Sequence, residues 1–197
     1  SKIIPDIIID ATDFDVVEKM FTDYGPFDGA VNCAGSLFLK PAHLTSQNGF
    51  METINSSLTT AFALVRAAGK YMRDGGSVVL ISSAAAMEGL ANHEAIAAAK
   101  AGVIGLMRSA AATYAGQNLR FNAIAPGLVE TTLTKSLTQS ESAKKYSQDM
   151  HALGRLGKAQ DIARAICFLL DKDNDWITGQ VLAVDGGLSR VRPKPRA

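Results

Sequence analysis

The sequence predicts an α/β fold with a mainly parallel sheet, and three observations carry the prediction. Short, mostly β-branched apolar runs recur along the 197 residues and alternate with longer helix-like stretches. A polar or turn-forming residue closes each apolar run, as at the end of a buried strand. The hydrophobic fraction of 47% supplies a core for one domain, which we place at residues 1–189.

The apolar runs expected as strands are, in order, residues 7–9, 27–32, 77–81, 120–125 and 179–185. The first helix is capped by Asp13 and ended by Gly25–Pro26. The later helices are expected over residues 48–72, 94–114 and 159–170. The polar stretch 128–150 is expected as an excursion over a site, and the basic tail 190–197 as a disordered end.

Composition excludes several classes of protein. The formal net charge is +1, so the chain lacks the basic stripe that nucleic-acid binding requires. No apolar run approaches the ~20 residues of a membrane-spanning helix, and the N-terminus has no signal-peptide pattern, so we expect a cytoplasmic location. The two cysteines, Cys33 and Cys167, and three scattered histidines give neither a zinc spacing nor a disulfide framework, so no metal is expected.

Polar residues follow the expected strands at their carboxyl ends. They are Asp10, Asn32–Gly35, Ser82–Ser83 and Pro126–Gly127. Parallel sheets bind ligands at this edge, so the site is expected there.

These residues, at this spacing, resemble the short-chain dehydrogenase/reductases. Asn32-Cys33-Ala34-Gly35 is similar to the family's Asn-Asn-Ala-Gly turn, and Lys100 follows Ser83 at the family's interval of seventeen residues. Further matches are Asp10, Asn55, Asn122, Pro126–Gly127, Thr131 and residues 184–187. The resemblance spans residues 6–189 and implies a Rossmann-like, doubly wound parallel sheet with helices on both faces.

The resemblance also implies an oxidoreductase that transfers hydride between NAD or NADP and a small carbonyl, alcohol, enoyl or acyl substrate. The implied catalytic residues are Ser83, Lys100, Asn55 and His93. The implied cofactor-binding residues are Asp10, Asn32, Ala34, Gly35, Lys100, Pro126, Gly127, Val129 and Thr131. Asn55 is expected to bridge to Lys100 through its backbone or a water, and Lys100 to hold the cofactor ribose.

Two departures from the family pattern qualify this expectation. The family's opening βαβ unit, with its Gly-rich pyrophosphate turn, has no counterpart, so the sheet is expected to have an exposed edge. Ile96 stands where the family has its catalytic Tyr, four residues before Lys100. A chain without that proton donor fits reduction of a conjugated C=C bond, where water supplies the proton. His93 is an alternative proton donor, and Tyr146, in the excursion over the site, is an alternative group expected to reach in.

Other interpretations remain open at this stage. The chain is alternatively a degenerate, truncated homologue that acts as an oligomerising or regulatory subunit. Self-association is expected in either case, through the small-residue helix 95–116 and the helix around Asn55. Cys33 is expected to be a small buried hydrophobe, and Ser83 is alternatively a cap of the turn after its strand.

Overall fold

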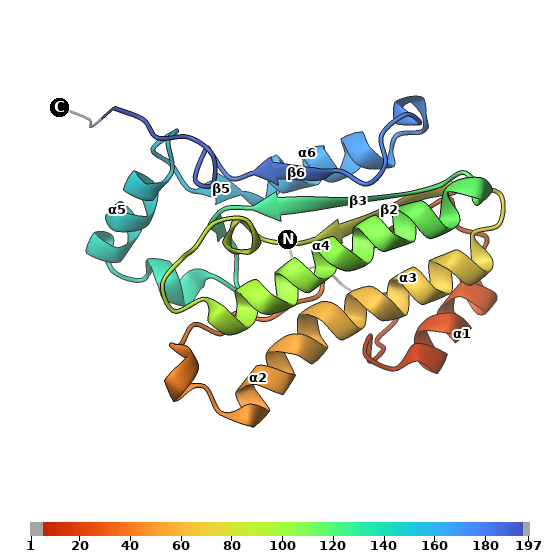
Figure 1. Ribbon diagram of the computed structural model, residues 1–197, viewed down its shortest axis with the longest axis horizontal. Helices are drawn as coiled ribbons and strands as arrows, with labels where there is room; N and C mark the ends of the chain where they lie inside the picture. The colour runs from red at the N-terminus through yellow and green to blue at the C-terminus, as the bar shows by residue number, and fades with distance from the viewer. Residues whose placement is uncertain (1–5, 195–197) are drawn as a thin grey trace.

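A computed structural model describes residues 6–194 of the chain. Its centre is a parallel sheet of four strands in the order β1-β2-β3-β6 (Figure 1). The strands are β1 (Gly29–Asn32), β2 (Gly76–Ile81), β3 (Leu119–Pro126) and β6 (Val181–Val184). Their carboxyl ends point toward α5 (Glu141–Met150), so the polar residues after each strand share one edge (Figure 1).

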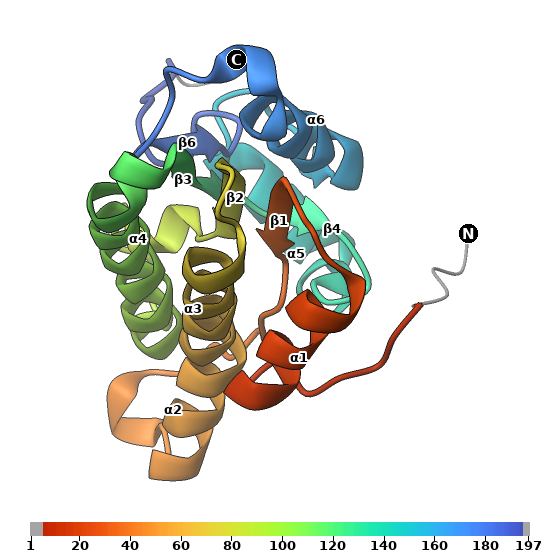
Figure 2. The same ribbon diagram turned by 90° about the vertical axis from the view of Figure 1, so that its right-hand side faces the viewer.

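Helices cover both faces of the sheet, as predicted. Helices α1 (Phe14–Tyr24), α3 (Thr60–Tyr71) and α4 (Glu94–Tyr114) lie on one face, and α6 (Ala159–Leu170) lies on the other (Figure 2). The alternation of strand side chains divides the core: Val78 and Leu80 join the α3 and α4 side, whereas Val79 packs with Leu169 of α6. The expected bounds of α4 and α6 are confirmed to the residue.

The expected helix 48–72 forms with an interruption. It consists of α2 (Gln47–Ile54), a π-helical turn (Asn55–Thr59) and α3. The π turn adds a residue to the local repeat, so faces extrapolated at 3.6 residues per turn do not carry through it. Short 3₁₀ turns occupy Ala42–Leu44, Ala84–Ala86, Ala115–Gln117, Lys135–Thr138 and Lys172–Asn174.

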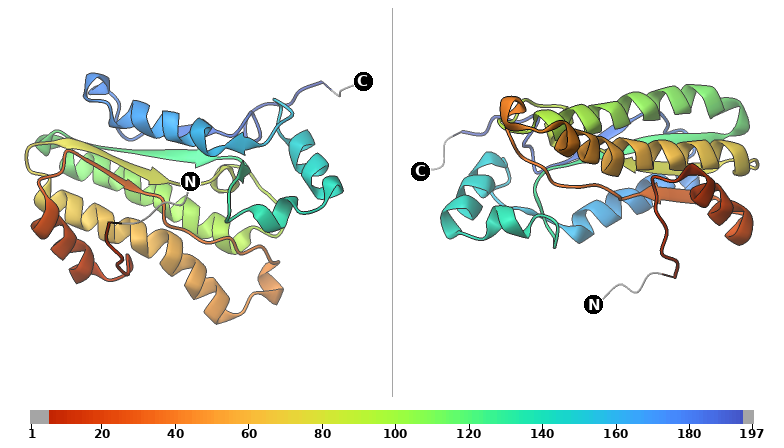
Figure 3. Two further views of the ribbon diagram at one scale, coloured as in Figure 1. Left: turned by 180° about the vertical axis from the view of Figure 1, so that it is seen from behind. Right: turned by 90° about the horizontal axis from the view of Figure 1, so that it is seen from below.

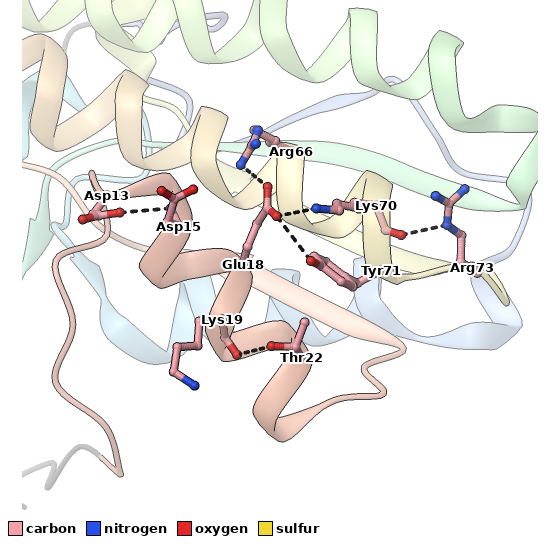
Figure 4. A network of polar contacts seen from close by, with 9 residues as sticks. All are labelled: Asp13, Asp15, Glu18, Lys19, Thr22, Arg66, Lys70, Tyr71 and Arg73. Carbon is pink, nitrogen blue, oxygen red and sulfur yellow. Dashed lines mark hydrogen bonds and ion pairs between the residues drawn. The ribbon is translucent and has the colours of Figure 1, made fainter.

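An ion-pair cluster fastens α1 to α3. The Glu18 carboxylate contacts the guanidinium of Arg66 and accepts hydrogen bonds from Lys70 (2.6 Å) and Tyr71 (3.3 Å), as Figure 4 shows. The Lys70 hydrogen bond is the main reason that the pKa of Glu18 lies below its ordinary value. Asp13 caps α1 as predicted, because its side chain accepts from the amides of Asp15 and Val16.

The excursion 128–150 is a short strand followed by helical turns. The strand β4 (Val129–Glu130) pairs with β5 (Gly157–Lys158), and the chain between them contains α5 at the carboxyl edge of the main sheet (Figure 3). No residue of α5 is buried. Packing of α5 therefore contributes little to holding this segment in place.

The predicted strand 7–9 is wrong. Residues 7–10 have no regular structure, Ile8 is 87% exposed, and the segment leads away from the sheet (Figure 2). A strand needs a neighbour to satisfy its backbone, and no described strand presents an edge to these residues. An exposed sheet edge is present as expected, but it belongs to β1, which pairs only with β2 among the described residues.

Two further features bear on the expectations. The helical stretch Glu94–Gln117 does have the length and composition to cross a membrane, but half of the most apolar window is buried inside the fold, as in a core helix. In the basic tail, residues 190–194 are exposed, and Arg192 pairs with Glu88 at 2.9 Å. Expectations for residues 1–5 and 195–197 lie outside the described part of the chain.

Candidate active site

Lys100 is the buried cation of the carboxyl edge. Its residue is 7% exposed, and its Nζ donates to the carbonyl of Ile81, at the end of β2, over 2.9 Å. Burial lowers the pKa of Lys100 from 10.5 to about 8. An ammonium has three protons, so two remain for other acceptors. The side chain is therefore enclosed by protein, with its ammonium at the end of β2.

The turn after β1 passes directly over this ammonium. A Cβ atom built on Gly35 would lie 3.2 Å from Nζ of Lys100 and 3.7 Å from Oγ of Ser57. Asn32 shapes the turn, because its side chain accepts from the amide of Ala34 at 2.8 Å. The structure thus brings Gly35 to Lys100, in a turn that Asn32 and Ala34 shape.

Asn55 makes no described side-chain contact with Lys100, and its predicted bridge through the backbone or a water stays a prediction. Its side chain is exposed, and its Oδ1 accepts from Thr59 at 3.1 Å within the same π turn. Ser57, two residues later, is 1% exposed and holds the position near Gly35 and Lys100. The Oγ of Ser57 has no hydrogen-bond partner among the described residues.

A sequence signal for Ser57 existed. Thr53, Ser57, Thr60 and Leu64 recur at helical spacing and are all buried. Three of the four are polar, so they do not form the apolar stripe that usually marks the buried face of a helix.

Ser83 and His93 lie on the loop between β2 and α4. The Oγ of Ser83 accepts from the amide of Ala85 at 3.1 Å, which caps a 3₁₀ turn and leaves the hydroxyl proton free to donate. His93 is the N-cap residue of α4, and its Nδ1 bonds to the carbonyl of Ala91 at 2.7 Å. The Nε2 of His93 has no described partner.

Ile96 lies one helical turn before Lys100 and is 6% exposed. Its side chain is apolar and has no proton to donate; its match to the family's catalytic Tyr position stays a prediction. Tyr146 lies on α5 and is exposed.

The end of β3 supplies the third side of the site. Pro126 pairs in register with Val184 of β6, and Gly127 donates from its amide to the carbonyl of Val184 at 3.3 Å. Val129 is buried in β4. Thr131 is exposed and bonds within its own turn to Thr134. Asn122 is fully buried and bonds to the backbone of Ile177 and Gln180, so it holds β3 to the chain entering β6.

Two expected residues differ from their predicted surroundings. Asp10 does not end a strand; it is exposed, and hydrogen bonds from Thr12 lower the pKa of its carboxyl. Cys33 is exposed instead of buried, because the Asn32–Gly35 turn projects beyond the sheet. Partial desolvation still raises the pKa of the Cys33 thiol, and the Lys100 ammonium offsets part of that effect.

Among the described residues, no group of three or more His, Cys, Asp or Glu side chains is placed to hold a metal ion. The charged centre of the edge is instead the ammonium of Lys100. The groups that this edge offers to a ligand are the ammonium of Lys100, the hydroxyls of Ser57 and Ser83, and the backbone of the turns that contain Gly35 and Gly127.

Comparisons with known proteins agree with this arrangement. A family model described as Enoyl-(Acyl carrier protein) reductase matches residues 5–189. The 3-oxoacyl-[acyl-carrier-protein] reductase FabG of Thermotoga maritima is 36% identical over 189 residues, which cover 92% of this chain and 75% of that protein.

Comparisons with solved structures agree with these sequence comparisons. ElxO with NADP bound superposes with a TM-score of 0.85 at 32% identity, covering 91% of this chain and 76% of that one. A short-chain type dehydrogenase/reductase from Mycobacterium ulcerans superposes with a TM-score of 0.84 at 31% identity, covering 93% and 70%. The chain therefore belongs to the short-chain dehydrogenase/reductase family of NAD(P)-dependent oxidoreductases.

Proposed function

We propose that this chain reduces a C=C bond conjugated to an acyl carbonyl, with NADH or NADPH as the reductant. The observation that carries the proposal is the pair Lys100 and Ile96: the edge keeps a buried ammonium but has isoleucine one helical turn before it. Carbonyl reduction needs a proton donor at the new alkoxide. Reduction of a conjugated C=C bond needs only hydrogen-bond donors at the enolate oxygen, and water supplies the proton at carbon.

The residues present fit a nicotinamide cofactor at this edge. Among the described residues, two protons of Lys100 and the buried hydroxyl of Ser57 have no partner, and both groups lie near Gly35, so they suit ribose hydroxyls. Gly35 leaves open the space that a Cβ would fill against Nζ. When bound, the cofactor supplies the hydride. The further proposed cofactor contacts are Asn32, Ala34, Gly127, Val129 and the exposed Thr131. Asp10 is also proposed to contact the cofactor, from an exposed loop instead of a strand end.

Ser83 is the proposed hydrogen-bond donor to the substrate oxygen. Its Oγ already accepts from Ala85, which fixes the oxygen and directs the hydroxyl proton outward. His93, with a free Nε2, is the alternative proton source.

The second candidate is a non-catalytic, oligomerising subunit, favoured by the same Ile96. The outer face of α3 and α4 carries a groove of about 210 Å³ lined by Phe62, Leu106 and Tyr114, among others. Phe62 is exposed there. We propose self-association through this face under both candidates, with the cytoplasm as the location.

The test is a comparison of substrates at equal chain length. The chain is incubated with NADPH or NADH and an enoyl thioester or the matching 3-oxoacyl thioester, and loss of reduced cofactor is followed by absorbance. Turnover of the enoyl substrate alone supports the proposal, whereas turnover of the 3-oxoacyl substrate overturns the choice of reaction. Nucleotide binding without turnover of either substrate, or no binding at all, favours the second candidate.

A further inference from the structure

His151 is a buried imidazole that the sequence analysis did not single out. It is 3% exposed and directly follows α5, at the end of the excursion 128–150. Its Nδ1 lies 2.6 Å from the carbonyl of Ser147, and its Nε2 lies 3.1 Å from the amide of Leu128. A carbonyl only accepts and an amide only donates, so Nδ1 carries the proton and Nε2 is bare. Both bonds are made by the neutral ring.

Glycine at position 127 is what permits this contact. A Cβ on Gly127 would lie 2.6 Å from Nε2 of His151 and 3.0 Å from Cα of Asp185. The turns that contain Gly127, His151 and Asp185 therefore meet at one point.

The chain after His151 rests on the last of these turns. The amide of Leu153 donates to the carbonyl of Gly186 at 3.0 Å, and a Cβ on Gly187 would lie 2.8 Å from that of Ala152. The imidazole thus joins the far end of the excursion to the Pro126–Gly127–Leu128 turn.

Little else holds the excursion in place. No residue of α5 is buried, and the ion pair between Lys144 and Glu130 is half exposed, so it contributes little. The β4–β5 pairing involves two residues on each strand. Among the described residues, Val129 is buried at the start of this segment, and His151 is the buried anchor at its far end.

We infer that His151 is a positioning residue whose neutral form fastens residues 128–150 over the carboxyl edge and whose protonation releases them. A proton on Nε2 would face the amide proton of Leu128, so that hydrogen bond is lost and a charge is buried. The consequence for catalysis rests on the proposed function, whereas the release of the segment does not.

The charged groups around the ring define what the protonated form meets. Asp185 faces it from the end of β6; burial raises the pKa of that carboxyl, but hydrogen bonds from Ser189 and Gly187, and a positive charge on the nearby His151, lower it. On the ring's own segment, Asp149 is paired with Lys145, and Arg155 with Asp161. The turn 126–128 has no titratable side chain. A protonated ring is thus drawn toward Asp185 and away from Leu128.

The experiment is hydrogen–deuterium exchange by mass spectrometry on the full chain between pH 5 and 8, corrected for intrinsic exchange rates. We expect exchange in peptides covering residues 128–150 to rise about tenfold at the acid end, as one buried hydrogen bond is lost. Peptides of β2 should not change. The variant His151→Gln keeps one acceptor and one donor without titrating, so its exchange should be independent of pH. The variant His43→Gln, at an exposed histidine, should keep the wild-type profile.

Three results would overturn the inference: a flat wild-type profile, a His151→Gln profile equal to wild type, or a rise that β2 shares. The wild-type pH series needs no variant to fold, so the inference is tested even if His151→Gln is unstable. Exchange is measured without cofactor or substrate. Failure of the proposed reductase activity is therefore distinguishable from failure of this inference.

Discussion

Gly35 and Lys100 are in close contact: a Cβ at residue 35 would lie 3.2 Å from Nζ of the lysine, so one of the two groups would have to give way. The ammonium is the flexible end of its side chain, so it would shift and the backbone would stay. This relationship gives the first prediction. Gly35→Ala should change the free energy of unfolding by less than about 1 kcal/mol. Nucleotide affinity, measured by calorimetry, should fall about threefold to tenfold, because the ammonium no longer points at the ribose.

Gly116→Ala is the matched control. A Cβ at position 116 meets nothing within 4 Å, so affinity should stay unchanged. If Gly35→Ala and the parent chain bind nucleotide with equal affinity, Lys100 does not contact the nucleotide.

The second prediction concerns Lys100 and pH. The ammonium has a pKa of about 8 in the folded chain and 10.5 ordinarily, so between these values the unfolded chain binds more protons. The free energy of unfolding should therefore rise with pH across this range, by at most about 3 kcal/mol. Urea denaturation at pH 7, 8, 9 and 10 measures the rise. Nucleotide affinity should fall over the same interval, as the ammonium loses its charge.

Lys100→Met should abolish the rise and should unfold at higher urea than the parent chain at pH 7, because the cost of burying the charge is gone. Lys172→Met, at an exposed lysine, should keep the rise in the free energy of unfolding with pH. A rise that persists in Lys100→Met would show that another group titrates.

The third prediction concerns Ile96. Ile96→Tyr places a phenol one helical turn before Lys100. The nearby ammonium lowers the pKa of that phenol from ~10 toward working pH. A positioned general acid contributes about 10²–10⁴-fold, so reduction of 3-oxoacyl thioesters or ketones should appear or increase. Cofactor consumption measures the effect.

Ile96→Phe is the control, because it adds the ring without the hydroxyl. It should show no gain in carbonyl reduction. If Ile96→Tyr binds nucleotide normally and reduces no carbonyl substrate, Ser83 is not a catalytic residue of this chain.

The fourth prediction uses the exposed thiol of Cys33. Its raised pKa implies that alkylation by iodoacetamide accelerates at a higher pH than for a free cysteine. A nucleotide seated between Gly35 and Lys100 should shield the sulfur. At a concentration about ten times Kd, the alkylation rate should fall about tenfold. The measurement uses a Cys167→Ser background, because Cys167 is exposed as well. Unprotected alkylation at saturating NADPH would place the nucleotide elsewhere.

The fifth prediction concerns assembly. Ala98 and Gly105 are exposed on α4, and a Cβ at Gly105 meets nothing within 4 Å, so a partner helix has room to approach. Gly105→Trp or Ala98→Trp should convert an oligomer to monomers in sedimentation velocity. Gly116→Trp, on the turn that follows α4, should leave the oligomer intact. A parent chain that sediments as a monomer would contradict the proposed interface.

Local chemistry was sufficient to predict much of the fold. Asp13, Gly25–Pro26 and the alanine-rich stretch Glu94–Tyr114 specify helices through capping, breaking and propensity, which act within a few residues. The run in β2 is β-branched and bounded by glycines and serines, so its bounds were predicted within one residue. The polar strand ends predicted the edge that holds the site, because parallel strands end at one edge of the sheet. Lys100 came from the resemblance to the family, through its interval of seventeen residues after Ser83.

Only the tertiary structure decided the rest. Residues 7–9 have the composition of a strand, yet a strand exists only where a neighbouring edge accepts its hydrogen bonds. Ser57, rather than the side chain of Asn55, lies near Gly35 and Lys100, because a π turn and a polar buried face set the helix orientation. The buried position of His151 could not be predicted from the sequence, because it depends on three turns that are distant in sequence and meet around its ring. In each case the deciding interaction joins residues far apart along the chain, so short-range patterns do not carry it.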